Sequence, residues 1–221
     1  MKKTIFTITL LFTFVLSINA QIKEGYLKYN LEVSSDQPEM AMTVSMMENS
    51  SMEIWFSKKA VRCDITMGTM MDMSTIVNND SKDVLMLLGG MMGNTAVKTD
   101  IKTIESEDDE EEVEKPEIKF YNETKQILGY KCKKAESISK DGKKTTFWYT
   151  DKIEIATEGQ SSINADLPGI ALEYESNDNG LLMKFTVVDI DKKIKDKSVF
   201  SLDVPEGYNE MSWETFKSMG M

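Results

Sequence analysis

The chain of 221 residues contains no histidine, and Arg62 is its only arginine. Without an imidazole it has no Ser-His-Asp or Cys-His arrangement and no histidine-ligated zinc site. It also lacks a nucleophile elbow, a phosphate-binding loop, a dinucleotide fingerprint and a Cys-x-x-Cys pair. We therefore predict that the protein is not an enzyme and needs no cofactor.

Basic residues are outnumbered by acidic ones, 26 to 37, which gives a net charge of −11. Residues 105–117 hold nine acidic residues and a single lysine, so this tract alone contributes −8 and the rest of the chain −3. With Val113 as its only large apolar side chain, we predict that the tract is a disordered acidic loop, without the spaced ligands of a calcium loop. Nucleic acid is not an expected partner, because phosphates would be repelled.

The N-terminus has the three parts of a secretory signal. Lys2 and Lys3 precede an apolar run over residues 4–16, and Ile18-Asn19-Ala20 is a suitable cleavage site before Gln21. No later segment is long and apolar enough to span a membrane. We predict that residues 1–20 are cleaved, and that residues 21–221 form one exported domain, periplasmic or secreted, monomeric and without a transmembrane segment.

Cysteine is scarce, with only Cys63 and Cys132. Alternation puts each thiol on the apolar side of its predicted strand. In an oxidising compartment the two could form a disulfide worth about 4 kcal/mol by the chain-entropy estimate. Two buried free cysteines fit the sequence equally well, so both alternatives stay open.

Alternation of apolar and polar residues dominates the chain, as in Leu27, Tyr29, Leu31 and Val33, and predicts antiparallel strands with one dry face. Further strands are expected at 52–56, 60–67, 73–78, 84–88, 118–121, 130–139, 143–150, 170–176, 181–191 and 199–202. Residues 36–49 fit both a strand and a helix period, and Pro38 and Glu39 favour a helix. A second short helix is expected at 211–219, where Trp213 and Phe216 could dock on the sheet.

Methionine is the residue in excess: twelve of the 17 lie between Met40 and Met92. Methionine is flexible and apolar, so the excess suggests an adaptable apolar lining. Thioethers also bind Cu(I), a soft ion. The alternative is therefore a periplasmic Cu(I)-binding protein whose metal site is Met67, Met70, Met71 and Met73.

Two sets of motifs carry a family resemblance. Leu128-Gly129-Tyr130-Lys131-Cys132, Trp148-Tyr149-Thr150-Asp151 and Leu167-Pro168-Gly169-Ile170 with Glu173 resemble the C-terminal half of exported GLPGLI-type and related domain-of-unknown-function proteins of Bacteroidota. Asp166 stands where the GLPGLI pattern has its first glycine. Ile54-Trp55-Phe56 through Val61-Arg62, followed by Ile76-Val77-Asn78-Asn79-Asp80 and Val84-Leu85-Met86-Leu87, is similar in layout to the LolA-like lipoprotein carriers.

The resemblance implies a mainly β (α+β) fold: a single strongly curved antiparallel sheet, a LolA-like half-barrel, with one or a few short helices covering the concave face. It implies that the concave cavity holds an apolar ligand, a lipid or a lipidated protein. The ligand-binding residues expected on the lid segment and facing strands are Met40, Val44, Met47, Met67, Met71, Met73, Met86 and Leu88. Arg62 matches a carrier arginine that holds the lid, although alternation points it away from the apolar face, towards Asp64. A third hypothesis is an envelope interaction module whose acidic loop contacts a basic partner.

Overall fold

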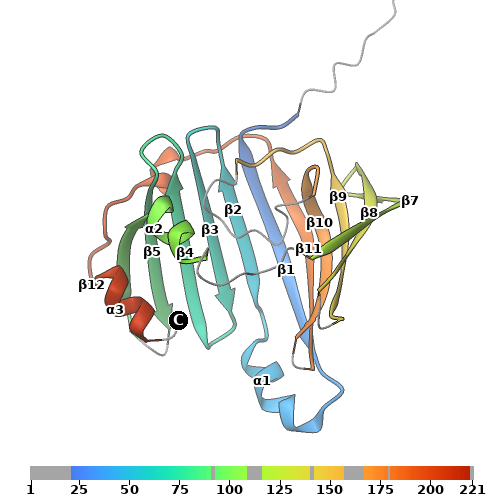
Figure 1. The fold of residues 1–221 in the computed structure, drawn as a ribbon, viewed down its shortest axis with the longest axis horizontal. Helices are drawn as coiled ribbons and strands as arrows, with labels where there is room; N and C mark the ends of the chain where they lie inside the picture. Colours follow the sequence, from blue (N-terminus) through green and yellow to red (C-terminus); the bar gives the residue numbers. More distant parts are fainter. Residues whose placement is uncertain are drawn as a thin grey trace, which may run out of the picture.

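The chain folds into a 12-stranded, strongly curved sheet in a computed structural model that describes residues 21–90, 93–108, 116–139, 142–156, 167–178 and 180–219 (Figure 1). The strand order is β12-β6-β5-β4-β3-β2-β1-β11-β10-β9-β8-β7. The strands are β1 Gly25–Ser34, β2 Ser51–Phe56, β3 Ala60–Met67, β4 Met71–Asn78, β5 Asp83–Gly90, β6 Thr95–Asp100, β7 Glu117–Ile127, β8 Tyr130–Ile138, β9 Lys144–Thr150, β10 Ile170–Asp178, β11 Leu181–Asp191 and β12 Asn209–Met211. This architecture confirms the predicted fold class of a curved, mainly antiparallel sheet with a few short helices.

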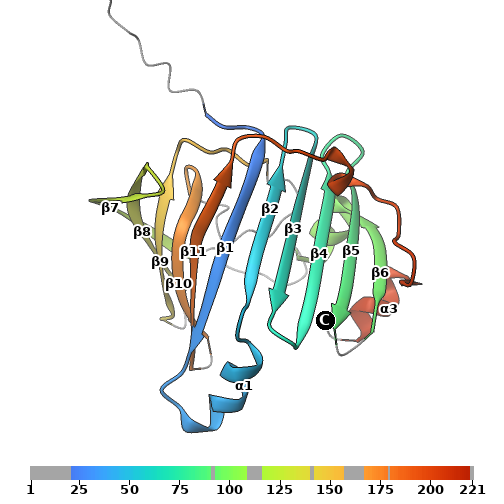
Figure 2. The same cartoon turned by 180° about the vertical axis from the view of Figure 1, so that it is seen from behind.

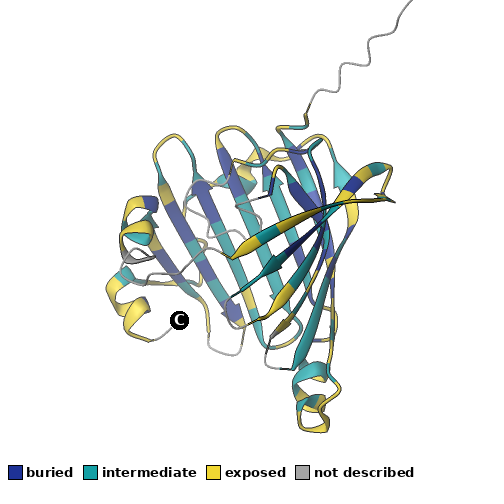
Figure 3. Ribbon diagram, turned by 45° about the vertical axis from the view of Figure 1, so that its right-hand side comes forward, coloured by how far each residue is buried: buried dark blue, intermediate teal, exposed yellow. Residues whose placement is uncertain are grey.

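The concave face carries the main core. Antiparallel partners such as Leu31 and Phe185, or Phe185 and Tyr174, place their side chains on the same face of the sheet. On this face, the adjacent strands β1, β11, β10 and β9 bury large apolar side chains. Tyr29 is fully buried, and its hydroxyl donates to the carbonyl oxygen of Ala171 at 2.9 Å. Figure 3 shows buried positions gathered along the central strands, while β7, the helices and the turns carry much of the exposed surface. One half of the concave face is therefore a filled core.

Short helices cover the other half of the concave face. They are α2 Ile101–Asp108 and α3 Trp213–Ser218. Ile101 and Ile104 of α2 pack on Val77 and Val84, and α3 buries Phe216. The expected helix at 211–219 is thus confirmed, although its first residue, Met211, belongs to β12.

The first helical segment lies elsewhere. Residues 36–49 form the short 3-10 helix η1 Pro38–Met40 and the helix α1 Ala41–Met46, as the helix period predicted. Both views place α1 beyond the ends of the strands (Figures 1 and 2). There the Thr69 amide of the β3–β4 turn donates to the Met46 carbonyl at 3.0 Å. The prediction that this segment is a lid over the concave face is therefore wrong.

The convex face is partly covered by the chain that follows β11, which crosses the back of the sheet (Figure 2). Leu202, Val204 and Tyr208 of this segment pack on a second buried cluster, which includes Ile76 and Leu85. Residues 199–202, predicted as a strand, instead overlap the 3-10 helix η2 Lys197–Phe200, which Asp196 caps by accepting from the Ser198 amide at 2.9 Å. Residues 192–208 are called the crossing segment below.

Arg62 anchors the crossing segment. Its Nε donates to Asp64 at 2.7 Å, and its Nη1 donates to the Val199 carbonyl at 3.1 Å. Arg62 points to the convex face, opposite the apolar concave face, as the alternation of side chains along β3 predicted. It is paired with Asp64 and holds no lid.

The acidic tract is partly regular structure. Residues 105–108 continue α2, and Glu117 begins β7, so the prediction of a loop over all of 105–117 is wrong at both ends. The helix is stabilised at its start, where Asp100 accepts from the Thr103 amide at 3.0 Å, an interaction that lowers the pKa of Asp100. Residues 109–115, like the predicted signal at 1–20, lie outside the described residues. Within the described part of the chain, no helix has the length and apolar character needed to cross a bilayer.

Glu136 on β8 is a buried carboxylate with three partners. It is 2.8 Å from the Lys144 ammonium and 3.3 Å from that of Lys134, and it accepts from the Tyr121 hydroxyl at 2.6 Å. Hydrogen bonds from Lys144 and then Tyr121 lower the pKa of Glu136 from its ordinary 4.5 to about 2. The charged form is therefore favoured by folding.

We expect this network to make stability pH-dependent in acid. A depressed pKa contributes stability that is present above 4.5 and is lost as the pH falls towards 2. Glu136→Gln should show a smaller loss of unfolding free energy across that window than the wild type does, as measured by denaturant titrations at stepped pH. Glu175→Gln, at an exposed site on β10, is the control. Equal slopes for Glu136→Gln and the wild type would contradict this role.

Candidate functional site

Methionines gather on the concave face of strands β3 to β5. Met67 lies directly opposite Met71, and Met73 opposite both Ile65 and Leu88, so these side chains share one face. Met86, opposite Thr75 on the neighbouring strand, belongs to the same face. All are half-buried. Five of the residues predicted to bind the ligand, Met67, Met71, Met73, Met86 and Leu88, therefore lie on one face of the sheet.

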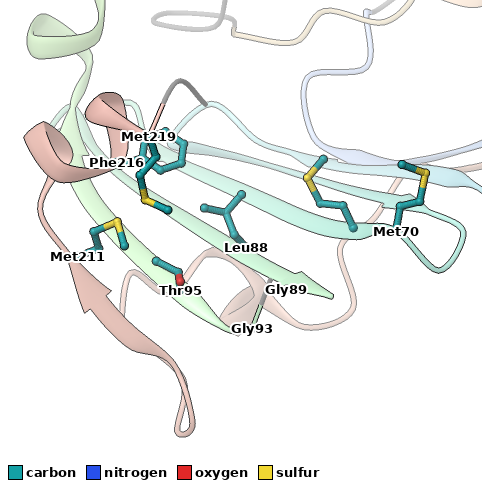
Figure 4. A pocket seen from close by; sticks show the side chains of 9 residues that line it. Met70, Leu88, Gly89, Gly93, Thr95, Met211, Phe216 and Met219 are labelled. Carbon is teal, nitrogen blue, oxygen red and sulfur yellow. The ribbon is translucent and has the colours of Figure 1, made fainter. Parts of the chain in front are cut away.

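A small pocket opens where α3 meets this face (Figure 4). Its volume is about 60 Å³. The lining is mostly apolar and consists of Met70, Met71, Leu88, Gly89, Gly93, Thr95, Met211, Phe216 and Met219. Figure 4 shows Phe216 and Met219 reaching in from α3 towards Leu88 and Met211. The pocket thus combines the β3–β4 turn, β5, β6, β12 and α3.

The position of α3 follows from two local features. Ser212 caps the helix, accepting from the Thr215 amide at 3.2 Å. Just before it, β12 pairs in parallel with β6, with Met211 opposite Val97. This pairing brings the end of the described chain beside residues more than 100 positions earlier, and it sets Phe216 over Leu88 and Thr95.

The structure divides the predicted ligand-binding residues into three groups. Met71 and Leu88 line the pocket, while Met67, Met73 and Met86 lie on the same face without lining it. Met40, Val44 and Met47 belong to the α1 region beyond the strands, with Met47 buried there. Thr95, Met211, Phe216 and Met219 were not among the predicted site residues. The only signal for the last three was the short helix expected at 211–219.

The alternative metal set, Met67, Met70, Met71 and Met73, is clustered at the β3–β4 turn. Met67 and Met71 form a cross-strand pair, and Met73 follows two residues later on the same face. Met70 lies in the turn, where it lines the pocket with Met71. As for other donors, no group of three His, Cys, Asp or Glu side chains in the described ranges is arranged to hold a metal.

Both cysteines are free, so the disulfide that the sequence allowed is absent. The register explains why. Cys63 faces the concave side with Ile54, whereas Cys132 pairs with Lys125 on the other face, and five strands separate them. Burial raises the pKa of Cys63 to about 12 and that of Cys132 to about 11. Both thiols therefore stay protonated and unreactive at neutral pH.

Comparison with known sequences identifies one family. The sequence profile described as "N-glycanase peptide, N-terminal domain" matches residues 73–217, which include most of the sheet and six of the nine residues that line the pocket. No curated protein sequence matches the chain significantly. The GLPGLI-type pattern remains a prediction.

Several solved structures are similar to this chain at low sequence identity. An uncharacterized conserved protein from Thermus thermophilus is 10% identical, with a TM-score of 0.51 over 86% of this chain and 91% of that one. A structure of PNGF-II is 18% identical, with a TM-score of 0.49 over 89% of this chain and 33% of that one. The chain thus spans about a third of the PNGF-II chain. A LolA superfamily protein from Nitrosomonas europaea is 6% identical, with a TM-score of 0.23 over 81% of this chain and 90% of that one.

Proposed function

Because the chain belongs to the family of N-glycanase peptide N-terminal domains, we propose that it is a binding domain and not a catalyst. It corresponds to about a third of a PNGF-II chain, so the activity of that whole protein is not assigned to it. Its best-placed carboxylates are engaged in structure: Glu136, Glu173 and Asp64 each pair with a basic side chain. We further propose that the protein is exported, as the N-terminal signal predicts, and that it is a monomer.

The ligand we propose is an apolar chain, the acyl group of a lipid or of a lipidated protein. The observation that carries this proposal is the pocket under α3, where four methionines surround Leu88 and Phe216. Unbranched thioether side chains adapt to irregular apolar partners. Each methylene group that leaves water contributes about 0.8 kcal/mol, so the affinity rises with the length of chain that the site buries.

The size of the pocket suggests how the ligand enters. A volume of about 60 Å³ accepts a few methylene groups and no more. A longer chain requires α3 to move. This helix is only six residues long and buries one residue, Phe216, so its displacement costs little. The acyl chain would then lie along Met71, Met73 and Met86 on the open face.

The test uses two measurements on the full chain. Native mass spectrometry of protein purified from its own cell envelope should find co-purifying lipid, and delipidated protein should bind a fluorescent fatty acid saturably. The fluorescent probe should be displaced by unlabelled palmitate. A lipid-free protein that also ignores the fatty acid would refute the proposal.

A second candidate, Cu(I) binding, is favoured by the Met67–Met71 pair with Met73 on the same face. The same experiment distinguishes the two when it includes a variant with Met67, Met70, Met71 and Met73 changed to leucine. Leucine preserves an apolar surface but removes the thioethers. If the ligand is a lipid, the fatty acid affinity should stay close to the wild-type value. If it is copper, tight Cu(I) binding should be present in the wild type and lost in the variant.

A further inference from the structure

The convex face carries an aromatic row that the proposed acyl site does not use. Tyr26 lies opposite Trp55 across β1 and β2, and Trp55 lies opposite Arg62 on β3. On the other side Tyr26 is paired with Asp191 of β11. The Tyr26 and Trp55 rings are 5.1 Å apart between centroids and inclined at 45°. Four strands thus present two adjacent aromatic rings with a charged residue at each end of the row.

The crossing segment forms a second wall over this row. Between them lies a depression of about 230 Å³. Its lining is Tyr26, Trp55, Asp191, Lys193, Ile194, Lys195, Asp196 and Val199. Its shape is fixed, because Arg62 binds both Asp64 and the Val199 carbonyl while its guanidinium lies 5.6 Å from the Trp55 ring centre. The rings are therefore held in place before any ligand arrives.

The charges around the depression select the ligand. Two lysines and two aspartates line it, so their charges cancel. Arg62 already occupies a cation position at Trp55, so a second cation there would be repelled. The other half of the lining, Tyr26, Trp55, Ile194 and Val199, is aromatic or apolar, so the depression offers flat apolar surface beside charged groups. The matching ligand is uncharged, with a flat apolar face and polar groups around its rim.

We propose that this depression binds a carbohydrate ring. The C–H face of a pyranose would stack on Trp55, and Tyr26, inclined at 45° to it, would contact the edge of the sugar. Its hydroxyl groups would donate to the carboxylate of Asp191 and accept from the ammonium of Lys193. The volume suits one sugar unit, with the rest of an oligosaccharide extending along the open side of the depression. The site lies on the face opposite the acyl pocket, so the sugar proposal and the acyl proposal can be tested independently of one another.

The test is an NMR titration of the ¹⁵N-labelled protein. The chain has three tryptophans, whose indole N–H signals are resolved and assigned with single Trp→Phe variants. The probes are the methyl glycosides of glucose, galactose, mannose and N-acetylglucosamine at millimolar concentrations. At least one of them should shift the Trp55 signal saturably while leaving the Trp148 and Trp213 signals in place. This readout uses the wild-type chain and does not depend on a variant that folds.

Matched variants extend the test. Trp55→Ala should weaken sugar binding about tenfold, a loss of about 1.4 kcal/mol. Trp148→Ala is the control, because Trp148 is also on the convex face and also faces a cation, Lys125 at 4.6 Å, but lies outside the depression. The proposal is overturned if no glycoside shifts the Trp55 signal, or if Trp148→Ala weakens binding as much as Trp55→Ala. It is also overturned if choline binds there more tightly than every sugar.

Discussion

Gly169→Ala will destabilise the protein by about 3 kcal/mol, and thereby lower Tm by about 6 to 12 °C. A Cβ atom on Gly169 would overlap the carbonyl oxygen of Thr150 and lie 3.0 Å from the Asp151 Cα. Both are backbone atoms, so no side-chain rotation relieves the overlap. The contact stands where β10 begins to pair with β9, Ile170 being opposite Thr150. The substitution must therefore push apart two strands of the filled core.

The control for this prediction is Gly129→Ala. Gly129 has a φ of +82°, which an alanine tolerates poorly, but a Cβ atom there would meet nothing within 4 Å. Its cost should be about 1 kcal/mol, from backbone conformation alone. Thermal and denaturant unfolding of both variants measure the difference. Equal destabilisation would mean that the close approach to Thr150 does not determine the requirement for glycine.

The second large effect concerns the acyl pocket. Leu88→Glu should abolish detectable fatty acid binding, because a carboxylate at the centre of the pocket must lose its water when the chain enters. A penalty of about 3 kcal/mol corresponds to a more than hundredfold loss of affinity. Leu128→Glu is the matched control: it adds the same charge at an exposed leucine in the β7–β8 turn. Displacement titrations with the fluorescent fatty acid compare the two.

A second variant, which fills the pocket with a larger apolar side chain, tests the same site in case Leu88→Glu folds poorly. Thr95 faces Leu88 across β5 and β6 and lines the same pocket. Thr95→Phe should reduce affinity for the acyl chain by occupying its space while keeping the surface apolar. If Leu88→Glu and Thr95→Phe both bind fatty acid as the wild type does, the ligand does not use this pocket.

The strands were predictable wherever apolar and polar residues alternate for long enough. The bounds of β3 and β11 agree with the sequence prediction, and most others differ by one or two residues. The prediction missed β6, since Thr95–Asp100 has only Ala96 and Val97 as apolar residues. It also missed β12, which is three residues long and pairs in parallel across a long separation. It ended β7 too early, because a register shift between Phe120 and Thr124 breaks the alternation.

The site was predictable only where it lies on regularly alternating strands. Within each strand, alternation fixes which residues share a face, so Cys63, Ile65 and Met67 could be grouped from the sequence. The pairing of β3 with β4 and β5, which adds Met71, Met73, Met86 and Leu88 to that face, needs the register. The sequence could not place α1, since a helical period gives the apolar side of a helix but not its position relative to a sheet. It could not bring Met211 and Phe216 to Leu88, because that contact depends on the parallel pairing of β12 with β6.

The parallel pairing of β12 with β6 also sets an order of events during synthesis. Chains emerge from the ribosome N-terminus first, so β4, β5 and β6 exist well before residues 202–216 do. Until then the outer side of Ile76 and Leu85 has no cover, and the edge of β6 has no partner strand. A nascent chain halted before Leu202 should therefore expose apolar surface and depend on chaperones. The acyl pocket under α3 is accordingly among the last parts of the molecule to be completed, because Met211 and Phe216 line it.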